Sequence, residues 1–310
     1  MRIAVFGAGG VGGYFGGRLA EAGHDVTFVA RGRHLAAIRE RGLVVESSIG
    51  TMRIRNAQAT DDPTKVAPAD VVMFCVKLWD VEDASAKLAA MLASNGVVVP
   101  FQNGLDTPVI LERAVGADHV LGGVAYIAAT IREPGVIIHT GTMARLRVGA
   151  FPGGPAARAE EFATACKGAG IDIEVSPDIR RALWEKFCFL SALSGTTSLA
   201  RSPVGVIRAD QDLRMTFEDA VREAFDVGRK SGVALADEFV AKQMAALDGL
   251  PAEMKTSMLN DLTAGGRLEA PWLSGAVARL AAESGLAAPV SRVLYAAVKP
   301  FVDGKPRSGN

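Results

Sequence analysis

The first part of the chain alternates short apolar runs, rich in β-branched residues, with stretches of helical periodicity. The runs are RIAVF, DVTFV, DVVMFCV, GVVVPF, GVIIHTG and RLRVGAF. Strands such as VVMFCV are apolar throughout, as is typical of a parallel sheet that helices cover on both faces. The segment VEDASAKLAAMLA, residues 81–93, has the length and period of a crossover helix. The pattern predicts a doubly wound α/β sheet over residues 1–176.

The pattern changes after Pro177, where strand-like runs stop and long amphipathic segments follow. In one of them an apolar residue recurs at every fourth position, at Leu213, Phe217, Val221 and Phe225. That helix ends in a basic turn followed by Gly232. We therefore predict an all-helical domain over residues 177–310, whose polar end GKPRSGN is frayed.

Composition narrows the classes of partner. The 310 residues are 49% hydrophobic, enough for two cores, and 34 basic residues balance 34 acidic ones. The resulting net charge of zero gives no electrostatic reason to expect nucleic acid or an anionic membrane as partner, so a small molecule is the expected ligand. Long amphipathic helices are compatible with a homodimer.

Two further features concern location and metals. The first strand starts at Arg2, no apolar run reaches about 18 residues, and the three cysteines lie far apart in apolar surroundings. These features predict a cytoplasmic protein with reduced thiols. The four histidines show no metal-ligand spacing, so we predict no metal.

A glycine-rich turn follows the first strand and precedes an alanine-rich helix. It has the form G-x-G-x-x-G at Gly7, Gly9 and Gly12, with Gly10 inside it. The first glycine permits the tight turn, the second lets a pyrophosphate approach the backbone, and the third lets the helix pack on the strand. This context predicts a Rossmann-type dinucleotide site with phosphates at the helix N-terminus.

The end of the second strand bears on which dinucleotide binds. Proteins that bind NAD usually have an acidic residue there, whereas this chain has Arg31, followed by Arg33 and His34. A guanidinium can bind a 2′-phosphate through two hydrogen bonds. The expected cofactor is NADP(H); the alternative interpretation of Arg31 is a solvated loop charge.

Two more strand ends carry polar groups. Lys77 follows FCV, and Gln102, Asn103 and Gly104 follow VVVPF. Ligands of open α/β sheets bind beyond the carboxyl ends of strands, so both Lys77 and Asn103 are candidate cofactor contacts. The alternatives are a surface lysine and a simple turn.

WEKFCFLSAL places Lys186 on a helix with apolar residues on every side. Burial would lower the pKa of its amine unless an acid compensates, and such an amine is a poised proton donor. The alternative is a lysine that extends to the domain edge or forms a structural ion pair.

Several motifs in this order resemble the ketopantoate reductase (2-dehydropantoate 2-reductase) family. They are FGAGGVGGYFG, Arg31, VKLWD, FQNG, PGVIIHTG, WEKF and SMLNDLTAGGRLEAPWLSG, and they span the chain. The resemblance implies an NADP-binding domain, a helical domain, and a 2-keto acid bound in the cleft between them.

The resemblance also implies roles for single residues. The family's catalytic lysine falls on Lys186, its acid on Glu269, and its substrate-binding serine on Ser257. Its cofactor contacts fall on Arg31, Lys77 and Asn103. The implied reaction is reduction of a carbonyl, in which the ammonium stabilises the developing alkoxide and protonates it.

The chain departs from the family after the lysine. The family has substrate-contacting asparagines at the fourth and eighth following positions, where this chain has Leu190 and Ser194. An apolar residue leaves a substrate hydroxyl without a partner, so we expect ketopantoate or a related, more apolar 2-keto acid.

Two other functions remain open from the sequence. One is another NADP-dependent dehydrogenase of hydroxy acids or opines; such enzymes usually show a catalytic histidine, and neither His119 nor His139 lies in such a context. The other is a non-catalytic NADP-binding sensor, which the presence of both Lys186 and Glu269 disfavours.

Overall fold

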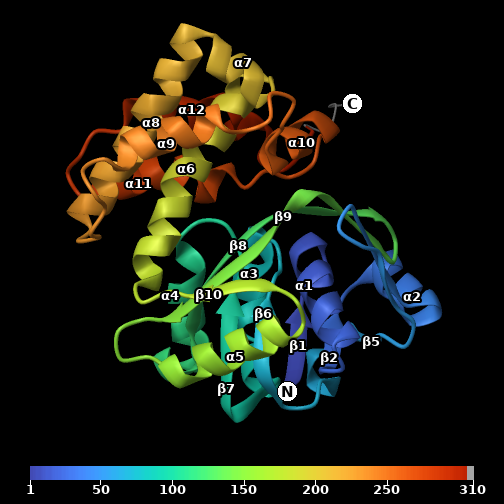
Figure 1. The fold of residues 1–310 in the computed structure, drawn as a ribbon. Helices are drawn as coiled ribbons and strands as arrows, with labels where there is room; N and C mark the ends of the chain where they lie inside the picture. The colour runs from blue at the N-terminus through green and yellow to red at the C-terminus, as the bar shows by residue number, and fades with distance from the viewer. Residues whose placement is uncertain (306–310) are drawn as a thin grey trace, which may run out of the picture. The chain divides into compact units, whose positions relative to one another are not determined.

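The computed structural model describes residues 1–305 and divides into two compact units (Figure 1). The first comprises residues 1–102 and 106–182, and the second comprises 103–105 together with the chain from Leu183 onward. The division falls inside helix α6 (Ile179–Ala200), and three residues that follow strand β7 belong to the second unit. Residues 306–310, part of the end predicted to be frayed, lie outside the described residues.

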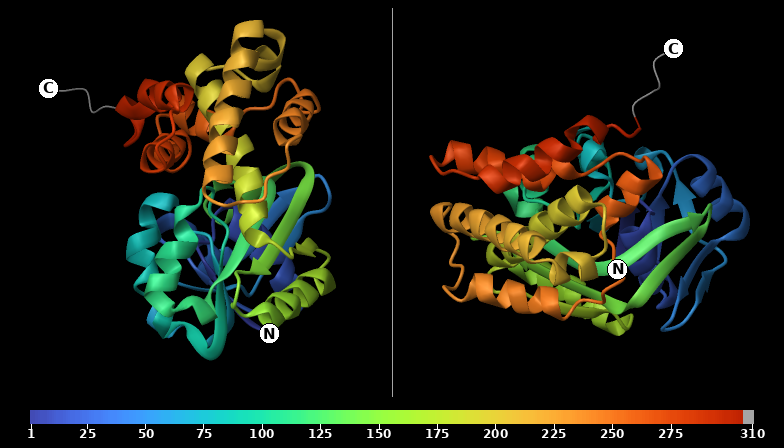
Figure 2. Two further views of the ribbon diagram at one scale, coloured as in Figure 1. Left: turned by 90° about the vertical axis from the view of Figure 1, so that its left-hand side faces the viewer. Right: turned by 90° about the horizontal axis from the view of Figure 1, so that it is seen from above.

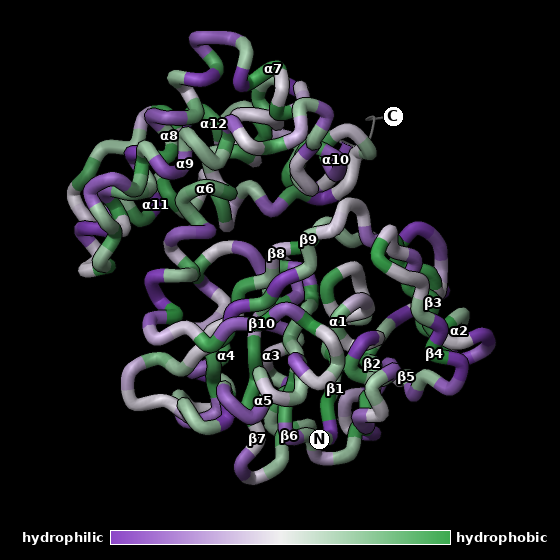
Figure 3. Tube along the Cα trace, viewed as in Figure 1, coloured by the Kyte–Doolittle hydropathy of each residue, from purple (hydrophilic) through white to green (hydrophobic). Residues whose placement is uncertain are grey.

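A parallel five-stranded sheet forms the centre of the first unit. Its order is β5-β2-β1-β6-β7, with β1 at Arg2–Phe6, β2 at Asp25–Val29, β5 at Gln58–Thr60, β6 at Ala69–Phe74 and β7 at Leu92–Pro100. The inner strands β1 and β6 are buried along most of their length, and Figure 3 shows them mostly in the hydrophobic colour. The predicted Rossmann-type sheet is confirmed.

Five α-helices belong wholly to this unit: α1 (Gly10–Glu21), α2 (Gly32–Arg41), α3 (Val81–Ser85), α4 (Asp106–Val115) and α5 (Ala156–Gly168). Short 3-10 turns lie at Pro63–Lys65, Leu78–Asp80, Leu88–Ala90 and Ala117–His119. The prediction of one crossover helix over residues 81–93 was wrong. Only α3 and a 3-10 turn form, because the Ala69 N–H donates to Met91 O and β7 begins at Leu92. Sheet pairing overrides helix propensity there.

A second sheet, which the sequence pattern did not predict, adjoins these elements. Its order is β10-β9-β3-β4, with β8 paired to β9; the strands are β3 (Leu43–Ser47), β4 (Met52–Ile54), β8 (Leu121–Glu133), β9 (Val136–Ala150) and β10 (Asp172–Val175). GVIIHTG and RLRVGAF, predicted as separate strands, are two ends of β9. The first five residues of β8 are all buried and the register of the antiparallel pair β8–β9 shifts at two later places, so β8 lacks a regular alternation of buried and exposed residues.

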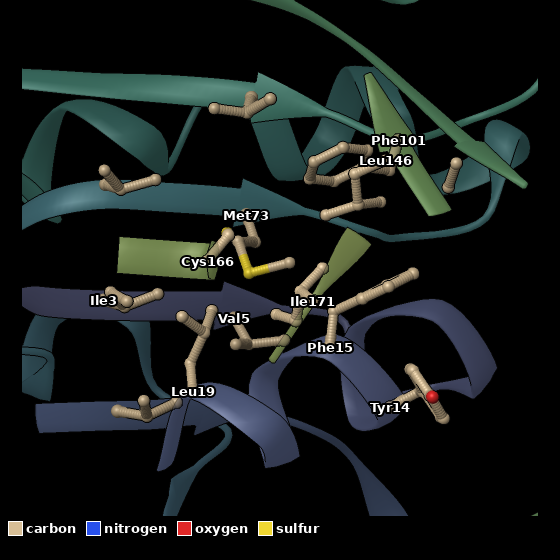
Figure 4. Packing of buried hydrophobic residues seen from close by; sticks show 14 of the residues in the cluster. Ile3, Val5, Tyr14, Phe15, Leu19, Met73, Phe101, Leu146, Cys166 and Ile171 are labelled. Atoms are coloured by element: carbon tan, nitrogen blue, oxygen red, sulfur yellow. The ribbon is translucent and has the colours of Figure 1, made fainter. Parts of the chain in front are cut away.

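The apolar core of the first unit holds α1 against the sheet. Figure 4 shows Phe15 and Leu19 of α1 near Ile3 and Val5 of β1. All four side chains are at most 2% exposed. Burial of such side chains is worth about 1.5–3 kcal/mol each, so the start of α1 is held firmly at the end of β1. The three cysteines are free thiols, as predicted.

The second unit is all-helical, as predicted. After α6 come α7 (Val204–Ala209), α8 (Gln211–Lys230), α9 (Phe239–Asp248), α10 (Ser257–Ala264), α11 (Ser274–Glu283) and α12 (Pro289–Val298), with 3-10 turns η5 (Ala270–Trp272) and η6 (Lys299–Phe301). Figure 2 shows these helices from two further sides. Phe217 and Val221 of the predicted apolar stripe are 0% exposed, and the Phe217 ring meets Phe189 of α6 edge to face. Within residues 1–305, no helix combines the length and hydropathy needed to cross a membrane.

Candidate active site

The glycine turn has a separate steric reason at each position. Gly7 has φ of +105°, and a Cβ on it would lie 2.7 Å from the Cys75 carbonyl. A Cβ on Gly12 would lie 2.2 Å from Gly7 O and 2.8 Å from Val5 Cγ1 of β1, so the helix can approach the strand only without a side chain. A Cβ on Gly9 would have no atom within 4 Å. Gly9 is therefore the position where the turn faces open space.

This turn fits a dinucleotide pyrophosphate. Helix α1 begins at Gly10, directly after the open position, and its first turn carries no acidic residue. The N–H groups at a helix start lack intrahelical partners and favour an anion. Gly10, which the sequence also assigned to the cofactor, has a packing role, because its Cβ would lie 1.9 Å from Ala129 O of β8.

Arg31 lies at the start of α2, where its side chain is 60% exposed. Its Nη1 is 3.8 Å from Asp80 Oδ1, an exposed pair of small energetic value that a phosphate could displace. His34 contributes differently from the sequence expectation of a positive or donor group beside a phosphate. Its Nε2–H donates to Ala8 O at 2.8 Å, and its Nδ1 accepts from the Gly135 N–H at 3.0 Å. Burial lowers its pKa, so His34 is a neutral structural link.

Lys77 follows β6, as the sequence indicated, and its exposed amine lies 5.4 Å from the centre of the Trp79 ring. Gln102, at the end of β7, donates through Nε2 to Phe74 O and Val76 O, both at 3.0 Å. This amide fastens the end of β7 to the end of β6. The chain leaves the first unit at the next residue.

Three side chains of the second unit form a hydrogen-bonded chain. Lys186 Nζ donates to Asn103 Oδ1 at 2.9 Å, and Asn103 Nδ2 donates to Glu269 Oε2 at 3.1 Å. The amide thus bridges an ammonium and a carboxylate, and only one orientation of the amide satisfies both. The sequence placed Asn103 with the cofactor; that contact stays a prediction, and the bridge is an additional role.

The surroundings of Lys186 shift its pKa toward neutrality. Its side chain is half-buried on α6. Burial lowers the pKa of the amine from 10.5 to about 8, and the negative charge of Glu269 opposes part of this shift. At pH 7 the amine is still mostly charged, yet it releases its proton more readily than an exposed lysine. This is the property expected of a general acid.

Neighbouring contacts hold the bridge in place. Gly104 has φ of +87°, and its Cβ position lies 2.9 Å from Trp272 O, so only glycine fits after Asn103. Glu269 lies between Leu268 and Ala270, both 0% exposed, and the Leu268 N–H donates to Val302 O at 2.9 Å. The backbone on both sides of the bridge is therefore fixed by packing.

The predicted substrate residues occupy three environments. Ser257 is exposed as the first residue of α10. Leu190 is half-buried one turn after Lys186 and packs on a cluster that includes Met258, the neighbour of Ser257. Ser194 is 1% exposed, and its Oγ has no hydrogen-bond partner in the part of the chain described. Leu190 thus packs on the apolar cluster that contains the residue next to Ser257, whereas the Ser194 side chain is buried.

Comparison with known proteins agrees with this architecture. A family model described as ketopantoate reductase PanE/ApbA matches residues 3–153, and the model of its C-terminal domain matches residues 178–302. A 2-dehydropantoate 2-reductase of Halobacterium salinarum is 34% identical over 297 residues, 95% of this chain and 96% of the relative. The uncharacterized oxidoreductase YkpB of Bacillus subtilis is 31% identical over 97% of this chain and 99% of its own.

A solved structure of similar fold is the PanE/ApbA family ketopantoate reductase of Ralstonia eutropha. Its TM-score is 0.89 at 31% identity, over 97% of this chain and 98% of that one. The dinucleotide-type glycine turn and the amine–amide–carboxylate chain define the class of protein, an oxidoreductase with an α/β unit and a helical unit. Within that class, the chain belongs to the ketopantoate reductase family.

Substitutions at two adjacent glycines should separate binding from packing. We expect Gly10→Ala to lower the free energy of unfolding by at least about 1–3 kcal/mol, because its Cβ meets backbone. Gly9→Ala should change stability by less than about 1 kcal/mol, since its Cβ enters open space, yet weaken NADPH binding at least about tenfold. Thermal unfolding and fluorescence titration measure the two effects. Unimpaired NADPH binding by Gly9→Ala would contradict the assignment of the open position to the pyrophosphate.

Proposed function

We propose that the protein reduces a 2-keto acid to the 2-hydroxy acid with NADPH, and that Lys186 is the proton donor. The observation that supports this most directly is the hydrogen-bonded chain from Lys186 through Asn103 to Glu269. A half-buried ammonium held by an amide and a carboxylate is poised to protonate an oxygen anion. The family membership supports the same reaction class.

When bound, NADPH supplies the hydride that adds to the keto carbon. Negative charge then develops on the carbonyl oxygen, where the Lys186 ammonium stabilises it and transfers a proton. An ammonium has three N–H donors, and Asn103 occupies one of them. Asn103 therefore helps to orient Nζ.

Glu269 sets the strength of the acid. Its charge keeps the pKa of Lys186 from falling further under burial, so the amine stays charged at neutral pH. Asn103 lies between the two groups in the hydrogen-bonded chain and holds both in place. The hydroxyl of Ser257, which is exposed at the start of α10, donates a hydrogen bond to the substrate carboxylate.

The cofactor is NADP(H) in this proposal. Gly7, Gly9, Gly10 and Gly12 form the pyrophosphate turn, Arg31 binds the 2′-phosphate, and Lys77 and Asn103 contact the rest of the dinucleotide. The support for Arg31 is its exposed guanidinium at the start of α2, in the place where an acidic residue would favour NAD.

The substrate is 2-dehydropantoate or a related, more apolar 2-keto acid. Leu190 packs with Met258, Leu262 and other apolar residues, so the wall one turn beyond Lys186 offers no hydrogen bond. Ser194 has a hydroxyl without a partner, but it is 1% exposed. A substrate side chain without a hydroxyl suits such a wall better than the hydroxyl of ketopantoate.

Turnover of NADPH with a panel of 2-keto acids tests the reaction. We expect Lys186→Ala to reduce kcat at least about a hundredfold while the Kd for NADPH changes little, because general acid catalysis contributes about 10²–10⁴-fold. Lys242→Ala is the matched control, since Lys242 is an exposed lysine that pairs with Glu238 on α9. Equal turnover in Lys186→Ala and wild type would indicate a binding protein or another proton donor. A clear preference for ketopantoate would contradict the preference for a more apolar 2-keto acid that is inferred from Leu190, but not the proposed reaction.

The pH dependence should report the amine. The charged form is the acid and predominates below its pKa, so kcat/KM for reduction should fall as pH rises through about 8. Glu269→Gln removes the charge that raises this pKa, so the inflection should move to lower pH. pH-rate profiles of both proteins check this, and an unmoved inflection in Glu269→Gln would show that Glu269 does not tune Lys186.

The ratio of kcat/KM with NADPH to that with NADH tests the cofactor. Arg31→Ala should lower this ratio at least about tenfold, because only NADPH carries the 2′-phosphate. Arg39→Ala is the control, since Arg39 is an exposed arginine on the same helix that pairs with Asp61. An unchanged ratio in Arg31→Ala would mean that Arg31 is a solvated charge.

A further inference from the structure

Two buried threonines join the helix of the catalytic lysine to the helix that begins with Ser257. Thr197 of α6 and Thr256, the residue before α10, are 0% and 4% exposed. Their hydroxyl oxygens are 3.0 Å apart. A buried hydrogen bond between side chains 59 positions apart is a specific link between two elements.

The direction of this hydrogen bond follows from the other partners. The single hydroxyl proton of Thr197 goes to Leu193 O at 2.7 Å. The Thr256 hydroxyl therefore donates to Thr197, while its oxygen accepts from the Leu259 N–H at 3.2 Å and caps α10. Both hydroxyl protons thus have an acceptor, and the first turn of α10 is attached to α6.

The link lies on the face of α6 that bears Lys186. Thr197 follows Lys186 by 11 positions (197 − 186), which is about three helical turns and returns to nearly the same direction. Between them, Leu190 packs on the cluster that contains Met258 and Leu262 of α10. One apolar and one polar contact therefore hold α10 to this face, and Ser257 is the residue next to Thr256.

We propose that Thr197 is a positioning residue for the substrate carboxylate. Through Thr256 it fixes the first turn of α10, and with it the Ser257 hydroxyl, at a set distance from the Lys186 amine. The inference rests on the proposed function, because a 2-keto acid carries its carboxylate directly beside the carbonyl that Lys186 protonates. Lys186 must contact the carbonyl oxygen of this short rigid group while Ser257 contacts its carboxylate. A small displacement of α10 therefore weakens the hydrogen bond between Ser257 and the carboxylate.

The test compares a 2-keto acid that wild type reduces with the corresponding neutral 2-keto amide, which lacks the carboxylate charge. Thr197→Val removes the hydroxyl at nearly constant volume. We expect it to raise KM for the keto acid about fivefold or more, as for loss of a buried hydrogen bond, and to lower the acid-to-amide ratio of kcat/KM equally. The Kd for NADPH and the pH inflection near 8 should not change.

Two further variants separate positioning from stability. Thr196→Val is the matched control, because Thr196 is also 0% exposed and its hydroxyl donates to Ala192 O at 2.8 Å. It should keep KM and the acid-to-amide ratio within about twofold of wild type. Thr197→Ser retains the hydroxyl, so its KM for the keto acid and its acid-to-amide ratio should both be close to the wild-type values. This comparison can be made even if Thr197→Val folds poorly.

The outcomes distinguish this inference from the proposed function. The positioning role alone is overturned if the wild-type protein turns over 2-keto acids and Thr197→Val leaves the acid-to-amide ratio of kcat/KM unchanged. It is also overturned if Thr196→Val changes this ratio as much as Thr197→Val does. If Thr197→Val does not fold, the positioning role is tested with Thr197→Ser, which retains the hydroxyl. An acid-to-amide ratio of kcat/KM in Thr197→Ser as low as about one fifth of the wild-type ratio then overturns the positioning role. Both proposals are overturned if the wild-type protein reduces none of the 2-keto acids and does not bind oxamate in the presence of NADPH.

Discussion

The proposed reaction depends on keeping the Lys186 amine charged while its side chain is half-buried. Burial favours the neutral form of Lys186, and the negative charge of Glu269 favours the ammonium. The balance leaves a pKa of about 8, where the group is charged at neutral pH and gives up its proton readily. Asn103 links the two groups, because its amide accepts from the amine and donates to the carboxylate. An amide has no charge of its own, so it orients both groups without neutralising either.

The glycine turn shows how one short motif can combine several constraints. Gly7 is required by a backbone angle, Gly12 by contact with the preceding strand, and Gly10 by contact with β8. Only Gly9 faces open space, so steric demand within the protein does not explain it, whereas the approach of a phosphate does. A motif match alone treats these glycines alike, whereas the structure gives Gly7, Gly10 and Gly12 steric roles and leaves Gly9 as the proposed point of phosphate approach.

Helix α6 organises the second unit around one of its faces. Lys186, Leu190 and Thr197 lie along it at the spacing of successive turns, and each makes a different contact: with Asn103, with the apolar cluster and with Thr256. The apolar contact of Leu190 also shapes the proposed substrate preference. In the proposed function, the same helix face thus carries the acid, part of the substrate wall and the contact that places Ser257.

Local sequence pattern determined much of the fold. The runs RIAVF and DVTFV are the strands Arg2–Phe6 and Asp25–Val29, and the loss of strand signal after Pro177 marked the all-helical part. The apolar surroundings of Lys186 on its helix marked it as a candidate, and the family motifs added Glu269 and Ser257. The tertiary structure alone decided the second sheet, the break in the helix predicted over 81–93, and the bridge at Asn103. Asn103 bonds to residues 83 and 166 positions away, and hydrophobic periodicity carries no information about pairs so distant in the chain. Such contacts arise only when the folded path brings three segments to one place.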